Sequence, residues 1–216
     1  MINMKYYKIL TQEMTSHKNT EWKLNVPITI EKEGVEMCTD QVLHCYNHPL
    51  LAVVFNPMHA NIKNPKLFEI NVDKIVNTDG LKFASKSQTL VKEISLPEIS
   101  LEQRIEFAIK VAKTVYKEEK WNLWADRWLS GEDRSKESAH IAAIAANANA
   151  IAAANAAANA AANSAANAAA YANTAYANAA NANAAASAAS AAYNFDKNEF
   201  NRKIIDIIES IVKVEA

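Results

Sequence analysis

Hydrophobic and polar positions in the first 98 residues follow the pattern of short β-strands separated by turns. Gly, Pro, Asn and Asp residues, which favour turns, interrupt the apolar runs. A short helix is expected over residues 39–46, capped by Thr39 or Asp40 through a side-chain oxygen. Five stretches rich in β-branched and aromatic residues are predicted as strands: 4–10, 24–30, 49–55, 67–72 and 81–94. The pattern predicts a small α+β domain over residues 1–98.

The pattern changes to that of helices after Pro97. Ser100 and Gln103 have the spacing of a capping box, in which each side chain bonds the other's backbone N–H. A second helix is expected over residues 121–129 and should end at Gly131, since glycine readily adopts the left-handed conformation that follows a helix. Its three tryptophans are expected in the core: Trp121, Trp124 and Trp128.

Alanine and asparagine dominate residues 139–193, which lack both helix breakers, Gly and Pro, and are predicted to be helical. One unbroken helix of this length would be about 80 Å long, so we expect a bend, with candidates at 147–149, 173–178 and 181–183. Larger side chains are expected to anchor the segment to a core: Ile141, Ile144, Ile151, Tyr171, Tyr176 and Tyr193.

Asparagine recurs every four residues in this segment, at positions 155, 159, 163 and 167. Two interpretations are open. The amides could bond across a close helix–helix interface and set its register, or they could make one face soluble. An amphipathic helix over residues 198–214 is expected to complete a helical domain of residues 99–216. Its expected apolar stripe is Phe200, Ile204, Ile207, Ile208 and Ile211.

Charge and composition exclude several classes of protein. The net charge of −1 argues against nucleic-acid binding, and two cysteines cannot form a disulfide scaffold. Three scattered glycines form no phosphate-binding loop, so no cofactor is expected. The first residues do not resemble a signal peptide, and the asparagines oppose membrane insertion of the Ala-rich stretch. We therefore expect no membrane association and a cytoplasmic location.

Candidate chemical groups gather between residues 38 and 69. A metal site would use Cys38, His44, Cys45, His48 and His59, but this set lacks the paired spacing typical of zinc sites, and no metal is expected. His44, Tyr46 and Glu69 resemble the loose His-Tyr-Glu set of NAD-using ADP-ribosyl transferases. An enzyme of this kind is an alternative, although we expect no catalytic residue, because the sequence shows no NAD clamp.

The layout of the chain resembles that of uncharacterised proteins common in phages, prophages and bacterial genomes. In that pattern a small α+β domain is followed by two helices and a long Ala-rich segment, and residues 124–135 are the most similar stretch. The positions that carry the resemblance in the first domain are Trp22, Cys38, His44, Glu69, Asp79 and Lys82.

This resemblance implies a non-catalytic, phage-type binding protein in the host cytoplasm. Its role would be counter-defence, by sequestering a nucleotide signal or a host defence protein. The expected ligand contacts are Trp22, His44, Glu69 and Lys82. One alternative is a structural protein whose Ala-rich helices form a homo-oligomer, because small side chains bury little area within one chain. The other is the NAD-using transferase-like enzyme.

Overall fold

The chain folds as an α+β protein with two compact units, Met1–Glu98 and Ile99–Ala216. The structure is a computed structural model, and it describes residues 4–16, 19–152, 156–172 and 196–212. None of the helices in these ranges is both long enough and apolar enough to cross a membrane.

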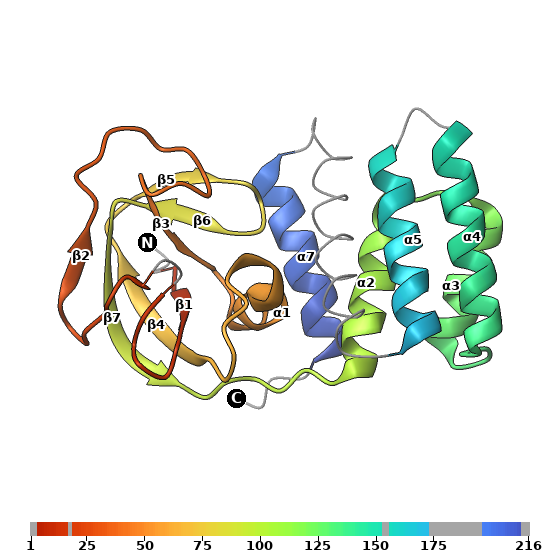
Figure 1. The fold of residues 1–216 in the computed structure, drawn as a ribbon, viewed down its shortest axis with the longest axis horizontal. Helices are drawn as coiled ribbons and strands as arrows, with labels where there is room; N and C mark the ends of the chain where they lie inside the picture. Colours follow the sequence, from red (N-terminus) through yellow and green to blue (C-terminus); the bar gives the residue numbers. More distant parts are fainter. Residues whose placement is uncertain (1–3, 17–18, 153–155, 173–195, 213–216) are drawn as a thin grey trace. The chain divides into compact units, whose positions relative to one another are not determined.

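The N-terminal unit contains two antiparallel sheets (Figure 1). The larger has the order β1-β4-β7-β2, with bounds Tyr6–Leu10, Lys66–Val72, Ser87–Ile94 and Pro27–Thr29. The smaller has the order β3-β6-β5, with bounds Leu43–Cys45, Phe83–Ser85 and Ile75–Thr78. Residues 81–94, predicted as one strand, are therefore divided between the two sheets.

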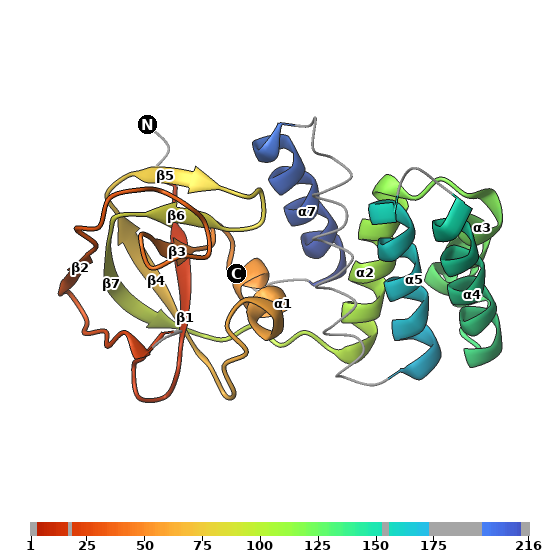
Figure 2. The ribbon, with the colours of Figure 1, turned by 45° about the horizontal axis from the view of Figure 1, so that its top comes forward.

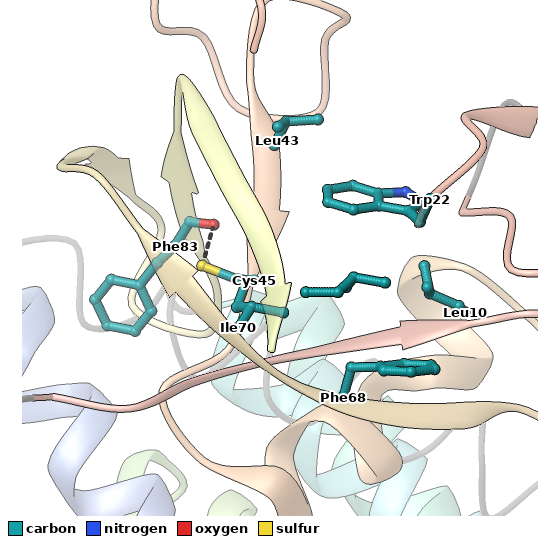
Figure 3. Close-up of a cluster of buried hydrophobic side chains, with 8 residues drawn as sticks. Leu10, Trp22, Leu43, Cys45, Phe68, Ile70 and Phe83 are labelled. Atoms are coloured by element: carbon teal, nitrogen blue, oxygen red, sulfur yellow. Dashed lines mark hydrogen bonds between the residues drawn. The ribbon is translucent and has the colours of Figure 1, made fainter. Parts of the chain in front are cut away.

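A single bridge joins β1 to the chain that follows β3. Tyr7 and Tyr46 exchange two backbone hydrogen bonds, of 2.7 and 2.9 Å. The core beside this bridge holds eight buried residues (Figure 3): Leu10, Trp22, Leu43, Cys45, Phe68, Ile70, Phe83 and Leu90. Cys45 donates to the carbonyl oxygen of Phe83 at 3.7 Å, and burial raises the pKa of its thiol to about 12. Cys45 therefore packs as a small apolar side chain.

Two predictions for this unit were wrong. Residues 49–55 are not a strand, because they belong to helix α1 (Pro49–His59). His48 caps the helix through its ring Nδ1, which accepts from the N–H of Leu50, and proline at the first helical position is already set at a helical φ. Residues 39–46 are not a helix either, since 43–45 pair with β6. A short apolar run does not by itself distinguish a buried helix from a strand.

The C-terminal unit consists of helices. They are α2 (Leu101–Val115), α3 (Glu119–Ser130), α4 (Lys136–Ala152), α5 (Ala156–Tyr171) and α7 (Lys197–Ile211). Helix α2 contacts α3, α5 and α7, and α5 also packs on α4 (Figures 1 and 2).

The predicted ends of the first helices are confirmed. Ser100 and Gln103 form the capping box of α2. Gly131 follows α3 with a φ of 82°, in the left-handed region. The three tryptophans of α3 are buried, as expected. Of the apolar stripe predicted for α7, Phe200, Ile204 and Ile208 are buried, whereas Ile207 and Ile211 are partly exposed.

Helices α4 and α5 pack directly on each other through small side chains. Seven alanines among the described side chains of α5 are buried: Ala161, Ala162, Ala165, Ala166, Ala168, Ala169 and Ala170. The Nδ2 of Asn163 donates to the backbone oxygen of Ala143 on α4 at 2.8 Å, and Asn167 donates to Oδ1 of Asn163 at 2.8 Å. Of the two interpretations of the asparagine row, the bond across the interface is therefore observed at Asn163.

Other expectations for the Ala-rich segment were wrong. The helix does not bend at 147–149, because α4 continues to Ala152 and α5 begins at Ala156. The other candidate bends, 173–178 and 181–183, lie outside the described residues, as do Tyr176 and Tyr193, and the side chain of Ile151 is not described either. Ile141 and Ile144 are not core anchors, since they are 66% and 56% exposed, and Tyr171 is also exposed. Among the described residues, the buried side chains of α4 and α5 are alanines, and Asn163 adds its hydrogen bond across the interface.

Candidate functional site

A cavity of about 400 Å³ lies within the N-terminal unit. Strand β1, helix α1, strand β3 and the loop before β3 all contribute to its wall. Apolar side chains such as Ile9, Val42 and Ala52 form part of the lining. The groups that could do chemistry on this wall are Lys8, Cys38, His44, Tyr46, His59 and Lys82.

Lys8 is a buried cation in this wall, with an exposed fraction of 6%. Its Nζ donates to the backbone oxygen of His44 at 2.6 Å and to Oε1 of Gln88 at 3.0 Å, and it lies 4.5 Å from the ring centre of Trp22. These partners are neutral, and none of the ion pairs found among the described residues includes Lys8. Burial lowers the pKa of Lys8 to about 8. The wall thus holds a positive charge that no carboxylate of the described part of the chain neutralises.

Lys82 is the second buried cation, with an exposed fraction of 7%. Its Nζ donates to Sγ of Cys38 at 3.1 Å and lies 4.0 Å from a carboxylate oxygen of Asp79. The other carboxylate oxygen of Asp79 accepts from the backbone N–H groups of Leu81 and Lys82, both at 2.9 Å. Asp79 therefore shapes the turn that brings Lys82 to the sulfur.

His44 connects the two lysines through its backbone and its ring. Its carbonyl oxygen accepts from Lys8, while ring Nε2 accepts from the backbone N–H of Cys38 at 3.0 Å. Because Nε2 is an acceptor, it carries no proton in this arrangement. The contacts run without a gap from Lys8 through His44 and Cys38 to Lys82.

Tyr46 and His59 form a second polar pair on the wall. The hydroxyl of Tyr46 lies 2.5 Å from Nδ1 of His59, and the two rings are stacked with centroids 5.8 Å apart. Burial, together with the charge of Lys82, lowers the pKa of His59 to about 4. Burial also raises the pKa of Tyr46 far above its usual value. Both groups are therefore neutral at pH 7.

The charges on the described part of the cavity wall are predominantly positive. Asp40 is the one carboxylate among these lining residues, and it is exposed and paired with Lys32. The buried charges are the two ammonium groups of Lys8 and Lys82. In a poorly hydrated wall such charges attract an anion more strongly than they would in water.

The structure brings together three of the four residues predicted as ligand contacts. His44 and Lys82 line the cavity, and Trp22 lies behind the wall, with its ring against the ammonium group of Lys8. Glu69 does not line the cavity. It lies on β4, where its carboxylate pairs with Lys5 at 3.5 Å and Lys92 at 3.6 Å.

The five cysteine and histidine residues considered for a metal site do not form one cluster, and several of them have other structural roles. Cys45 is in the core, His48 caps α1 and His59 bonds Tyr46. Within the described ranges, no three His, Cys, Asp or Glu side chains are grouped so that they could hold a metal ion.

Sequence reasoning missed Lys8, and it did not connect Tyr46 with His59. Tyr6, Lys8 and Leu10 share one face of β1, and Leu10 on that face is fully buried. A lysine at an inward position of a strand is thus the signal that could have identified Lys8. The Tyr46–His59 contact had no such signal, since it depends on residues 49–59 being helical.

Comparison with known proteins adds one similarity. A family described as "Domain of unknown function (DUF7666)" matches residues 4–102, which is nearly all of the N-terminal unit. No curated protein and no solved structure shows significant similarity to the chain. The match supports treating the unit that holds the cavity as a domain in its own right, and its description assigns no activity.

Proposed function

We propose that the N-terminal unit binds a small anionic ligand of the nucleotide class in this cavity and holds it without transforming it. The observation that carries the proposal is the buried ammonium group of Lys8, whose partners among the described residues are neutral. Keeping an ammonium group out of water is costly unless an opposite charge compensates it. A ligand phosphate in the cavity would supply that charge.

The size and lining of the cavity support a nucleotide rather than a bare inorganic ion. A volume of about 400 Å³ lies in the range of small-molecule sites, which combine apolar walls with a few polar groups. Ile9 and Val42 supply apolar surface for a base or sugar, and Lys82 supplies a second positive charge.

A holding role, rather than a catalytic one, agrees with how the polar groups are used. The ring Nε2 of His44 accepts from a backbone N–H, and the ring of His59 is paired with Tyr46. Glu69, the proposed partner of His44 in an enzyme, lies outside the cavity lining. Sequestering a nucleotide signal in the host cytoplasm is the counter-defence role that the resemblance to phage proteins implies, and it forms part of this proposal.

The test is ligand binding by the full chain. Native mass spectrometry of freshly purified protein should show a retained anionic molecule. Protein made ligand-free should bind at least one member of a panel of nucleoside mono-, di- and triphosphates and cyclic dinucleotides. The corresponding uncharged nucleosides should bind much more weakly.

Variants test whether binding depends on the lysines of the cavity or only on the net charge of the protein. Lys8→Met and Lys82→Met should each weaken binding about 10- to 100-fold, the usual value of a charge-assisted hydrogen bond. Lys92→Met removes the same charge from the outer side of β7 and should leave binding unchanged. Failure of every charged ligand to bind, or equal losses in all three variants, would refute the proposal.

A second candidate function is self-association of the C-terminal unit. Ile141 and Ile144 lie one turn apart on α4, and Leu123 lies on α3, which packs on α4. All three are more than half exposed. The alanines that the structure describes in the α4–α5 interface are already buried within the chain. An oligomer would therefore use these larger side chains and pair them with those of a second copy.

A further inference from the structure

Cys38 is placed differently from Cys45, the other cysteine of the chain. Cys38 is exposed and lines the cavity, whereas Cys45 is buried in the core. The sulfur of Cys38 accepts a hydrogen bond from Lys82, whose side chain is more than nine-tenths buried. One face of the sulfur is therefore against a fixed positive charge, while the residue itself is accessible to solvent.

From this arrangement we infer that Cys38 is a covalent modification site, at which the cavity takes up an anionic, low-molecular-mass disulfide as a mixed disulfide. Binding a ligand does not require a thiol, so this inference goes beyond the proposed function. It shares the cavity with that function but does not depend on which molecule normally occupies it.

The reaction is thiol–disulfide exchange and needs no further reactant. Cys38 first loses its proton to solvent, and its sulfur then attacks one sulfur of the reagent. A new S–S bond forms to Cys38 as the S–S bond of the reagent breaks. The departing thiolate takes the electron pair and is protonated by water. A thiolate is the attacking species in such exchanges.

The positive wall explains why an anionic reagent should be preferred. Lys82 contacts the attacking sulfur directly. Lys8 donates to the carbonyl oxygen of His44, whose ring accepts from the backbone N–H of Cys38. A carboxylate carried on the reagent approaches these charges as the sulfurs meet. Local charge changes encounter and reaction rates in this way, by about an order of magnitude for one nearby charge.

The experiment compares three disulfides of similar size and different charge. They are 3,3′-dithiodipropionate (anionic), 2-hydroxyethyl disulfide (neutral) and cystamine (cationic). Each is mixed with the full chain, and the rate of mass increase is followed by intact-mass spectrometry, with peptide mapping to assign the cysteine. Cys38 should react fastest with the anionic reagent and slowest with the cationic one, and Cys45 should remain unmodified in the folded protein.

Variants test the role of Lys82. Lys82→Met should lower the ratio of the anionic to the neutral rate about tenfold, and Lys92→Met should leave it unchanged. Asp79→Asn changes the charge in the opposite direction. Its amide oxygen can still accept from the two backbone N–H groups of the turn, but the negative charge 4.0 Å from Lys82 Nζ is gone. The same ratio should therefore rise.

The outcome is readable even if one variant does not fold, because Lys82→Met and Asp79→Asn predict changes of opposite sign. A rate ratio that is the same in the parent and in either folded variant would overturn the inference, as would preferential reaction with cystamine. Failure of nucleotide binding would not alter these rates, so the two proposals can fail separately.

Discussion

Lys8 Nζ and the backbone carbonyl oxygen of His44 are joined by a 2.6 Å hydrogen bond, which ties β1 of the larger sheet to β3 of the smaller. The bond lies close to the Tyr7–Tyr46 bridge, because Lys8 directly follows Tyr7 and His44 lies shortly before Tyr46. The same lysine thus contributes to the joining of the sheets and places a charge in the cavity wall. Because Lys8 is buried in the folded protein, its titration should change the free energy of unfolding with pH.

Lys8→Met should remove a pH-dependent part of the stability. The pKa of Lys8 is lowered from 10.5 to about 8, so between these values the unfolded chain binds a proton that the folded chain does not. Stability from this group is therefore fully present above pH 10.5 and is lost as the pH falls to about 8. Denaturant unfolding at pH 8 and pH 10 should show a larger gain for the parent than for Lys8→Met, approaching about 3 kcal/mol over the whole window. Equal gains would contradict this account.

His59→Gln should make the protein less sensitive to acid. The pKa of His59 is lowered from 6.5 to about 4, because burial and Lys82 disfavour its charged form. Its contribution to stability is therefore present above pH 6.5 and is lost as the pH falls to about 4. Comparing the free energy of unfolding at pH 7 and pH 5 should show a loss of about 2 kcal/mol that is specific to the parent. An identical loss in His59→Gln would show that His59 does not titrate in this way.

Asn163→Ala should destabilise the contact between α4 and α5. This variant loses the bond to Ala143 and the bond from Asn167, whereas Asn167→Ala loses only the latter. Both gain the same helix propensity from alanine, so that effect cancels in the comparison. Chemical denaturation should find Asn163→Ala less stable than Asn167→Ala by about 1 kcal/mol. If the two variants were equally stable, the bond across the interface would contribute nothing.

The double variant Ile141→Asp, Ile144→Asp should reduce self-association. Both side chains are exposed on α4, so the change adds charge at the surface without opening a cavity in the core. Light scattering across a concentration series should show an oligomer of the parent that dissociates in the double variant. Lys136→Asp, at an exposed position at the start of the same helix, serves as the control. A parent that stays monomeric at high concentration would rule out this candidate function.

Local signals in the sequence were sufficient for much of the secondary structure. The capping box at Ser100, the glycine at 131 and the stripe on α7 act through neighbouring residues or through one face of one helix. Strand β1 was also predicted, because its residues favour a pleated surface whatever they pair with. The α+β class followed from these elements.

Tertiary structure decided the features that depend on partners distant in the chain. Residues 49–55 form a helix, although an apolar run of that length is compatible with either a strand or a helix. Alanines, and not Ile141 or Ile144, fill the interface of α4 and α5, because small side chains let the two helices approach closely. The sequence marked His44 and Lys82, but only the pairing of β3 with β6 and the turn at Asp79 brought them, with Lys8, to one cavity. The effect of a buried lysine depends on the burial and the charges around it, and residues distant in the sequence supply these only when the chain folds.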